Sequence, residues 1–421
     1  MSQFTDLSIK LTKDISNEEI KNGGIFFTPQ SIIKKNIEII KKIDTISIKT
    51  ILEPSCGSCE YINILQNEFN NVTIVGIEKN TTIFEQIKDL YTNTTNTTNT
   101  TKITLHNANF IEYNDTQKYD LIIGNPPYFV MKKENVNNIY KSYIDGRPNI
   151  FTLFIIHSLL KLNINGILSF ILPSSFINCL YYDKIRKHIY THYKIIDIIH
   201  CDDDKYLDTE QKTLIFIVQN INNSDTIVNN NDTIVNNNNF VLLKNNYNIF
   251  NTKENIIKLK SLCNETENTL ESLGFNVNIG NVVWNQCKDI LTHDETKTRL
   301  IYNSDIVRQQ LTLKKYNNEE KKNYIDKEGN TNPLLVLNRG YGKGKYVLDY
   351  CLINIEKNYL VENHLICIKH TTETDKKKLL ELYNKIITSF NNPKTTEFIN
   401  LYFGNAAINT TELKTILPIY V

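Results

Sequence analysis

No apolar run in this sequence approaches the roughly 18 residues that a membrane-spanning helix needs. The chain also does not begin with the basic and then apolar segments of a secretory signal. These absences argue against a membrane protein and against a secreted one. We therefore expect a soluble, cytoplasmic protein without a membrane partner.

Cysteine pairs and excess charge are lacking as well. The eight cysteines are scattered over 421 residues, which is no disulfide framework. Cys56 and Cys59 are spaced like metal ligands, but no second Cys or His pair lies near them, so we expect no metal. The 47 basic and 46 acidic residues give a net charge of +1, which neither indicates nor excludes a nucleic-acid partner.

What is present in the first half is an alternation of short apolar runs with segments of helical spacing. This pattern predicts a parallel α/β sheet covered on both faces, an open doubly wound sheet of seven strands. The predicted strands are 50–54, 72–78, 103–110, 119–127, 166–173, 193–200 and 212–219. The predicted helices are 31–43, 149–162 and 181–192.

Two low-complexity inserts, 92–101 and 225–239, cannot bury a core and are interpreted as loops. The second insert marks a boundary, so we expect one domain over 1–245 and another over 246–421. Past this boundary, Tyr-, Asn- and Lys-rich segments alternate with short apolar runs, and 375–390 has the character of a helix. This alternation of residue types favours a mixed α+β domain.

Two predicted strand ends have the features of a nucleotide site. The segment "ILEPSCGSCE" (51–60) places small residues after its strand, in a turn that a ligand can approach closely. Glu78 ends the next strand about 25 residues later, where an acidic residue typically accepts hydrogen bonds from ribose hydroxyls. A solvated strand-end carboxylate is the alternative. Because G-x-x-x-x-G-K-[ST] is absent, we expect an adenosine ligand that carries no phosphate chain.

The fourth predicted strand ends in Asn125-Pro126-Pro127-Tyr128. Proline cannot donate to a sheet ladder, so the strand must stop there. The Asn125 side chain and the Pro126 backbone offer two carbonyl acceptors to one NH₂ group, and Tyr128 can lie flat against a planar ring. At the carboxyl edge of an α/β sheet, this predicts a site for a planar amine. An ordinary loop after a proline-terminated strand is the alternative.

With these motifs in this order, the chain resembles the gamma class of S-adenosylmethionine-dependent DNA N6-adenine methyltransferases, the class typified by the TaqI modification methylase. The resemblance covers the first half and continues more loosely to the C-terminus. It implies a Rossmann-like methyltransferase domain followed by a DNA target-recognition domain. S-adenosylmethionine would be the cofactor and double-stranded DNA the partner.

The resemblance also assigns residues. Asn125 and Pro126 would hold the target amine, with Tyr128 on one face of the base and Tyr206 on the other; Phe216 is the fallback for Tyr206. The cofactor-binding residues would be Phe26, Thr28, Glu53, Pro54, Ser55, Cys56, Glu78, Lys79, Asn109, Phe110, Asn125 and Phe154.

Two positions depart from the family pattern. Asn109 stands where the family usually has Asp, and it can accept a hydrogen bond from the adenine only without charge assistance. Cys59 stands where the family usually has glycine, which costs free energy if the position needs a positive φ. A non-catalytic DNA-binding protein with a decayed cofactor pocket is therefore an alternative.

The second half offers candidates for DNA contact. "NRGYGKGKY" (338–346) places cations among glycines and tyrosines, which suits a loop along a phosphate backbone or an Arg that reads guanine. Exposed turns without such a role, or a core position for the tryptophan, are the alternatives. The predicted DNA-binding residues are Trp284, Asn285, Lys288, Arg339, Lys343 and Lys345.

The activity that the resemblance implies is site-specific methylation of N6 on a flipped-out adenine, as in restriction-modification. The same type of tetrapeptide occurs in methyltransferases acting on N4-cytosine, RNA bases or protein glutamine, so these substrates stay open. The enzyme would be a monomer or weak dimer, acting where the DNA of its host or virus is replicated. A cognate restriction endonuclease would be a separate protein.

Overall fold

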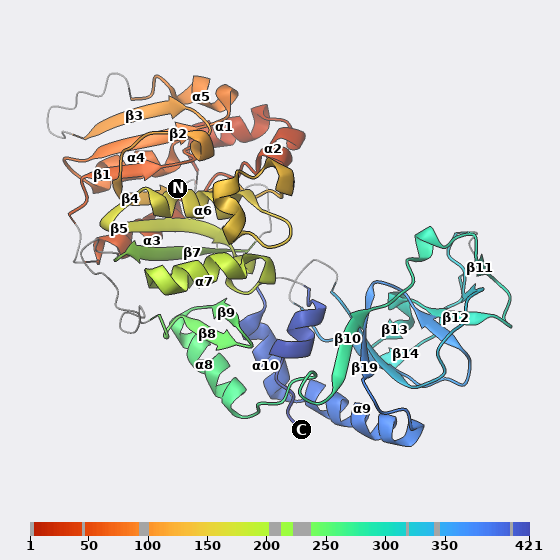
Figure 1. Ribbon diagram of the computed structural model, residues 1–421. Helices are drawn as coiled ribbons and strands as arrows, with labels where there is room; N and C mark the ends of the chain where they lie inside the picture. Colours follow the sequence, from red (N-terminus) through yellow and green to blue (C-terminus); the bar gives the residue numbers. More distant parts are fainter. Residues whose placement is uncertain are drawn as a thin grey trace. The chain divides into compact units, whose positions relative to one another are not determined.

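The computed structural model describes residues 4–43, 47–91, 101–201, 212–221, 237–316, 320–340, 346–404 and 407–421 (Figure 1). Most of both low-complexity inserts lies outside these ranges, as do the predicted site residues Tyr206, Lys343 and Lys345. The chain forms two compact units, Met1–Ile256 and Ile257–Val421. Among the described helices, none has both the length and the apolar character needed to cross a membrane.

A seven-stranded sheet forms the centre of the first unit, in the order β3-β2-β1-β4-β5-β7-β6. The strands are β1 (Thr50–Glu53), β2 (Thr73–Glu78), β3 (Lys102–Asn107), β4 (Tyr119–Gly124), β5 (Leu162–Pro173), β6 (Tyr193–His200) and β7 (Thr213–Asn220). Each coincides with a predicted strand, and the order reverses between β1 and β4, where α/β sheets bind ligands. The expected Rossmann-like sheet of seven strands is confirmed.

The sheet is mixed, however, and not wholly parallel as the alternating pattern predicts. β1 to β5 pair in parallel, whereas β7 runs antiparallel to both β5 and β6. Parallel neighbours need a crossover that is usually helical. The polar segment 201–212 between β6 and β7 has no helical apolar spacing, so β7 returns beside β6 in the manner of a hairpin.

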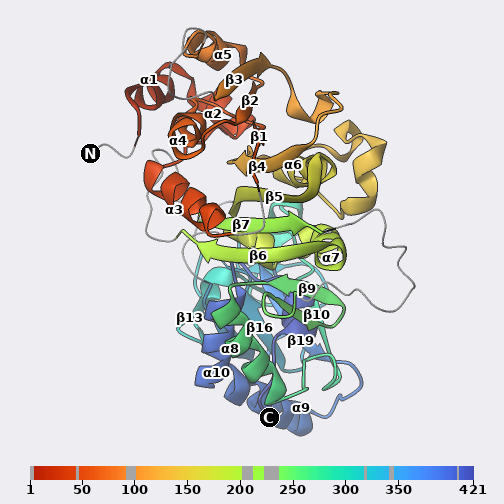
Figure 2. The same ribbon diagram turned by 90° about the vertical axis from the view of Figure 1, so that its left-hand side faces the viewer.

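Helices cover both faces of this sheet, with α1, α3 and α4 on one side and α6 and α7 on the other (Figure 2). The isoleucines of α3 recur at helical spacing and are buried against the sheet. The helices are α1 (Asp6–Asp14), α2 (Asn17–Gly23), α3 (Gln30–Lys41), α4 (Glu60–Glu68), α5 (Thr81–Ile87), α6 (Ile150–Leu160) and α7 (Asp183–His192). A hairpin of β8 (Val241–Lys244) and β9 (Tyr247–Phe250) follows, and α8 (Lys253–Asn264) spans the division between the units.

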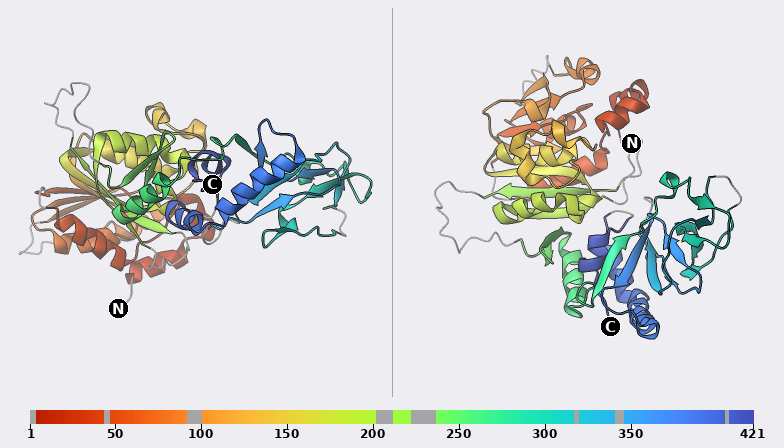
Figure 3. Two further views of the ribbon diagram at one scale, coloured as in Figure 1. Left: turned by 90° about the horizontal axis from the view of Figure 1, so that it is seen from below. Right: turned by 45° about the vertical axis from the view of Figure 1, so that its right-hand side comes forward.

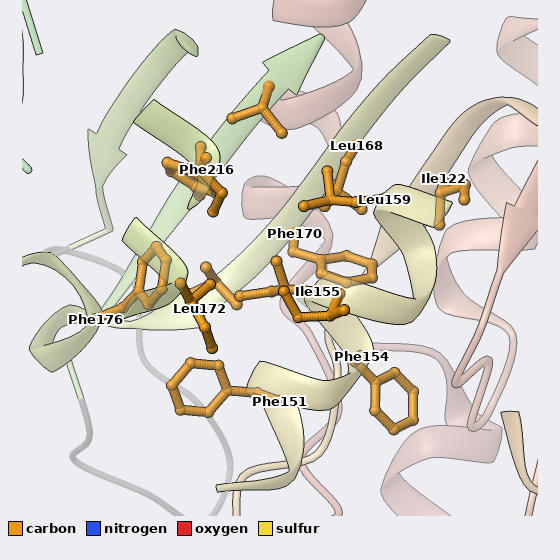
Figure 4. Close-up of a cluster of buried hydrophobic side chains, with 14 of the residues drawn as sticks. Ile122, Phe151, Phe154, Ile155, Leu159, Leu168, Phe170, Leu172, Phe176 and Phe216 are labelled. Carbon is orange, nitrogen blue, oxygen red and sulfur yellow. The ribbon is translucent and has the colours of Figure 1, made fainter. Parts of the chain in front are cut away.

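The core under α6 and α7 combines aliphatic side chains with several aromatic rings (Figure 4). Helix α6 contributes Phe151 and Phe154, and the turn after β5 contributes Phe176. Phe216 of β7 is fully buried here, stacked on Phe250 with ring centroids 6.0 Å apart. The fallback assignment of Phe216 to the target base is therefore wrong, because a buried ring has no open face.

Two four-stranded sheets form the second unit, in the orders β10-β19-β16-β17 and β11-β15-β12-β18. Helix α9 (Lys376–Phe390) confirms the helix predicted at 375–390 and lies along the first of these sheets, with Tyr383 against Phe275 at 5.8 Å between centroids (Figure 3). The other elements are β10 (Phe275–Ile279), β11 (Leu291–Thr292), β12 (Thr298–Ile301), β13 (Ile306–Val307), β14 (Gln310–Leu311), β15 (Tyr324–Ile325), β16 (Leu334–Asn338), β17 (Tyr350–Ile353), β18 (Tyr359–Val361), β19 (Leu365–His370) and α10 (Pro393–Tyr402).

Candidate active site

A cavity of about 910 Å³ lies at the carboxyl ends of β1, β2 and β4, beside the reversal of strand order. Segments 22–28, 53–58, 78–80 and 109–112 line it, together with Asn125 and the first turns of α6. All twelve residues that the sequence assigns to the cofactor are among the lining residues. The structure thus brings the whole set together, while the contact of each with a cofactor stays a prediction.

The lining of this cavity is acidic. Lys79 is the one basic side chain among the described lining residues, and six are glutamates: Glu19, Glu53, Glu60, Glu78, Glu112 and Glu134. A lining of this sign favours a cationic ligand and disfavours a phosphate chain. It fits the sulfonium and ammonium groups of S-adenosylmethionine.

Backbone hydrogen bonds hold the turn after β1. The Cys56 N–H donates to the Ile77 carbonyl at 2.9 Å, and the Gly57 N–H donates to Glu78 Oε2 at 2.9 Å. Cys59 ends the turn with φ at 65°, in the left-handed region, where a side chain costs about 1–2 kcal/mol. The position does require positive φ, so Cys59 carries strain that glycine would avoid.

Glu78 is bound at both carboxylate oxygens. Oε1 accepts from the Asn80 N–H at 2.6 Å, and Oε2 accepts from the Gly57 N–H. Burial raises the pKa of Glu78, and the backbone hydrogen bonds oppose this rise. With 8% exposure the residue is not the solvated strand-end carboxylate of the alternative interpretation. Each oxygen keeps a further lone pair, which a ribose hydroxyl could use.

Glu53 has an unusual environment. It is 2% exposed and lines the cavity, and its Oε2 has no hydrogen-bond partner among the described residues. Burial raises the pKa of Glu53 well above its ordinary range, and the nearby carboxylates of Glu78 and Glu60 add to the rise. A buried, unpartnered carboxyl oxygen on a cavity wall fits the ammonium group of the expected cofactor.

Glu60 has a role that no sequence motif indicates. Its Oε1 accepts from the Thr5 N–H at 2.7 Å, the Thr5 hydroxyl at 2.8 Å and the Ser8 hydroxyl at 2.5 Å. Its Oε2 accepts from Gln30 at 3.2 Å. This buried carboxylate therefore ties α1 and the start of α3 to the first turn of α4, beside the cavity. The partners lie at least 30 residues away in the chain, so no local pattern could indicate them.

Both ends of the Asn125 amide are fixed. Nδ2 donates to the Phe26 carbonyl at 3.1 Å, and Oδ1 accepts from the Tyr128 hydroxyl at 2.5 Å. The Ser55 hydroxyl, from the turn after β1, donates to the Asn125 backbone carbonyl at 3.1 Å. The predicted amine site is thus bonded directly to the predicted cofactor turn and to the N-terminal segment.

The Tyr128 ring is held by its hydroxyl. Besides Asn125, the oxygen lies 2.7 Å from the Ile171 carbonyl of β5. The ring meets Phe151 edge-on, with centroids 6.0 Å apart and planes at 88°. Tyr128 is half-buried and is not among the residues that line the cavity, so its stacking on a base stays a prediction.

Of the remaining predicted residues of this unit that the structure describes, Asn109, Phe110 and Phe154 line the cavity. Asn109 begins the short helical turn Phe110–Glu112 and accepts the Ile111 N–H at 3.4 Å. Phe110 packs on Phe154 at 5.1 Å between centroids. Pro126 is buried and absent from the lining. In the part of the chain that the structure describes, no group of three or more His, Cys, Asp and Glu side chains could hold a metal ion.

Replacing Gly24 with alanine is expected to destabilise the protein by at least about 1–2 kcal/mol. Gly24 has φ at 61°, and a Cβ there would lie 2.6 Å from the Tyr128 backbone nitrogen. Because the clash is with backbone atoms of Tyr128, the chain segment at Tyr128 would have to shift as a whole. Urea denaturation measures the change in the free energy of unfolding.

Gly23 provides the matched control for this substitution. A Cβ at Gly23 would meet only the flexible Ile25 side chain, at 3.1 and 3.2 Å, and the residue ends helix α2 without positive φ. Gly23→Ala should therefore leave stability nearly unchanged. Equal destabilisation by the two variants would contradict the importance of the close approach between Gly24 and Tyr128.

In the second unit, the predicted DNA-binding residues that are described lie at or near the surface. Trp284 is half-buried and packs against a small core, and Lys321 Nζ lies 6.0 Å from its ring centroid. The alternative interpretation, a core position for the tryptophan, is therefore partly correct. Asn285 and Lys288 are exposed, and Lys288 pairs with Glu320 at 3.4 Å. Arg339 is exposed as well. Their contact with DNA stays a prediction.

Comparison with known proteins agrees with this geometry. Residues 4–207 match the protein family described as Eco57I restriction-modification methylase. The matched range lies within the N-terminal unit, which is thus the part of the chain that is similar to methylases of this family. The matched range includes β1 to β6, the cavity and Asn125.

Individual relatives are of the same kind. Over 223 residues the chain is 29% identical to "Modification methylase CviBIII" of Paramecium bursaria Chlorella virus NC1A, covering 52% of this chain and 56% of that protein. Over 220 residues it is 30% identical to "Type II methyltransferase M.HincII" of Haemophilus influenzae, covering 48% and 39%. The chain thus spans about half the length of the first of these relatives and less of the second.

Among solved structures, the type IIG restriction endonuclease BpuSI aligns with 98% of this chain and 60% of its own, at 10% identity and a TM-score of 0.44. That likeness is distant. The fold assignment therefore depends on the strand order, the helices on both faces and the position of the cavity in this chain.

Proposed function

We propose that this protein is a site-specific DNA methyltransferase that transfers a methyl group from S-adenosylmethionine to N6 of adenine. The observation that carries the proposal is Asn125, which lies at the end of β4 on the wall of an acidic cavity with its amide oriented at both ends. The match of residues 4–207 to a methylase family supports methyl transfer as the reaction.

In this proposal, Asn125 and Pro126 hold the target amine. An amide oxygen can accept two hydrogen bonds, so Asn125 Oδ1 keeps a lone pair for an incoming N–H while Tyr128 occupies the other. The Pro126 carbonyl accepts the second N–H. Two acceptors draw the amine away from planarity and concentrate its lone pair, which is catalysis by positioning and electrostatics. When bound, S-adenosylmethionine supplies the electrophilic methyl group.

The substrate would be a base flipped out of duplex DNA, because the N6 amine is inaccessible inside the stack. Residues 246–421 would form the target-recognition domain, and Tyr128 would face one side of the flipped base. The protein would act where the DNA of its host or virus is replicated. A cognate restriction endonuclease would act as a separate protein.

Modified-base sequencing of DNA from cells that express the protein tests the proposal. We expect N6-methyladenine in one sequence context, and none in cells that express Asn125→Ala as the matched control. N4-methylcytosine would assign the site to a different amine. The absence of any mark, together with no S-adenosylmethionine binding by calorimetry, would instead support the decayed-pocket alternative.

S-adenosylmethionine binding is expected to release protons from Glu53. In the free protein burial raises the pKa of Glu53 and so favours its protonated form, whereas a cationic ligand favours the carboxylate. Below the raised pKa, affinity should therefore increase with pH by up to about tenfold per pH unit and level off above it. Calorimetry in two buffers of different ionisation enthalpy measures the protons released.

Glu53→Gln should bind more weakly and release no protons. The matched control is Glu112→Gln, because Glu112 lines the same cavity but is exposed. This control should keep the proton release of the unmodified protein. Release that persists in Glu53→Gln would contradict the assignment of the unpartnered carboxyl oxygen to the cofactor.

A further inference from the structure

A second, smaller hollow lies beside the predicted amine site, and its charge is opposite to that of the large cavity. It has a volume of about 460 Å³ and is here called the basic groove. Three cations and one carboxylate are among its lining residues. The full lining is Met131, Lys132, Lys133, Glu134, Gly146, Arg147 and Pro148.

Much of the acidic charge near the basic groove is already paired. Glu134 lies 3.8 Å from Lys132, and Asp145 lies 3.7 Å from Lys184. Within the described part of the chain, Lys133 and Arg147 form no ion pair. Both are exposed. The groove therefore presents two uncompensated cations, one of them a guanidinium whose planar fork matches a phosphate group.

The basic groove is built onto the loop that carries Asn125. Val130 and Asn149 form an antiparallel bridge, the Met131 N–H donates to the Pro148 carbonyl at 2.8 Å, and the Ile150 N–H donates to the Phe129 carbonyl at 3.0 Å. Met131 and Glu134 line both the groove and the large cavity. A ligand in the groove is thus held at a fixed place next to the predicted amine site.

We propose that the basic groove binds a backbone phosphate of the DNA strand that carries the target base, an inference that rests on the proposed function. A flipped nucleotide rotates about its backbone into the protein pocket, so the phosphates on either side of it lie close to the protein. The phosphates beside it then need cations, and the acidic cavity offers none but Lys79 among its described lining residues. Lys133 and Arg147 provide the charge next to that cavity.

The salt dependence of DNA binding tests this inference. Fluorescence anisotropy with a labelled mixed-sequence duplex gives the affinity of the full chain at several salt concentrations. The slope of log affinity against log salt falls by about one for each phosphate that the protein no longer neutralises. For the double variant Lys133→Gln/Arg147→Gln we expect a slope smaller by about 1–2 and weaker binding at physiological salt. S-adenosylmethionine affinity should not change.

Lys34→Gln/Lys35→Gln is the matched control, since it removes the same charge from the exposed side of α3. The proposal is overturned if the groove variant keeps the full slope, or if the control variant lowers it equally. It is also overturned if the unmodified protein binds no duplex. An absent methyl mark with intact, groove-dependent DNA binding would instead overturn only the proposed function.

A duplex with an uncharged methylphosphonate linkage locates the phosphate that the groove binds. Placed beside the methylated base that sequencing identifies, the neutral linkage should weaken binding to the unmodified protein and leave binding to the groove variant unchanged. Equal weakening of both would place the phosphate contact elsewhere on the protein.

Discussion

Asn125→Ala is expected to lower the methylation rate by at least about 100-fold, the loss usual when one preorganised hydrogen-bonding group is removed from a reacting centre. The variant deletes the side-chain acceptor for the target amine. It also deletes the donor to the Phe26 carbonyl, but that oxygen can be hydrated from the cavity. S-adenosylmethionine affinity should therefore change only a few-fold. Single-turnover kinetics and calorimetry separate the two effects.

Asn125→Asp is the informative companion to this variant. It keeps an oxygen where Oδ1 accepts hydrogen bonds and loses the N–H that reaches Phe26. If acceptance is the essential property, Asn125→Asp should retain more activity than Asn125→Ala. A parallel loss of cofactor affinity and methylation in Asn125→Ala would contradict the assignment of Asn125 to the target amine.

Tyr128→Ala is expected to be the next most damaging substitution. It removes the ring that would face the flipped base, and base–aromatic stacking contributes about 1–3 kcal/mol. It also removes the hydroxyl that orients the Asn125 amide and the edge contact with Phe151. Together these losses should lower the methylation rate by about 100-fold.

Tyr128→Phe isolates the hydroxyl. The ring and its contact with Phe151 remain, and only the hydroxyl is removed, whose single proton is shared between Asn125 Oδ1 and the Ile171 carbonyl. One hydrogen bond contributes about 1–1.5 kcal/mol, so we expect a loss of roughly tenfold in rate at an unchanged KM for the cofactor. In an Asn125→Ser background the hydroxyl has no amide to orient, and Tyr128→Phe should then have little further effect.

Two outcomes would revise this account of Tyr128. Equal damage by Tyr128→Phe and Tyr128→Ala would assign the whole effect to the hydroxyl and remove the stacking role. Undiminished damage by Tyr128→Phe in the Asn125→Ser background would show that the hydroxyl does not act through Asn125.

The sequence predicts those parts of the fold that local pattern determines. Buried parallel strands are continuous apolar runs, so 119–127 and 166–173 stand out and coincide with β4 and β5. The short helices α4 and α5 are not predicted, because at nine and seven residues they are too short to show a helical repeat of apolar positions. The antiparallel direction of β7 is not predicted either, because direction depends on the connection and not on the strand's own residues.

In the candidate site, too, the sequence predicts the residues that belong to local motifs but not the contacts between distant segments. Residues in the motifs line the cavity because each follows the end of a strand, and strand ends at one edge of a sheet meet. The contacts that orient these residues are not predictable. The Glu60 carboxylate meets Thr5 across 55 positions, and Asn125 meets Phe26 across 99. Such pairs follow from tertiary packing, which no window of sequence contains.

The hydrogen bond from the Ser55 hydroxyl to the Asn125 carbonyl joins the predicted cofactor turn to the predicted amine site. If a cofactor bound to the turn stabilises this position of Asn125, it also stabilises the binding of a target base to Asn125. Thermodynamic linkage then requires reciprocity: a cofactor that tightens DNA binding by some factor is itself tightened by DNA by the same factor. The two substrates of the proposed reaction would therefore bind cooperatively.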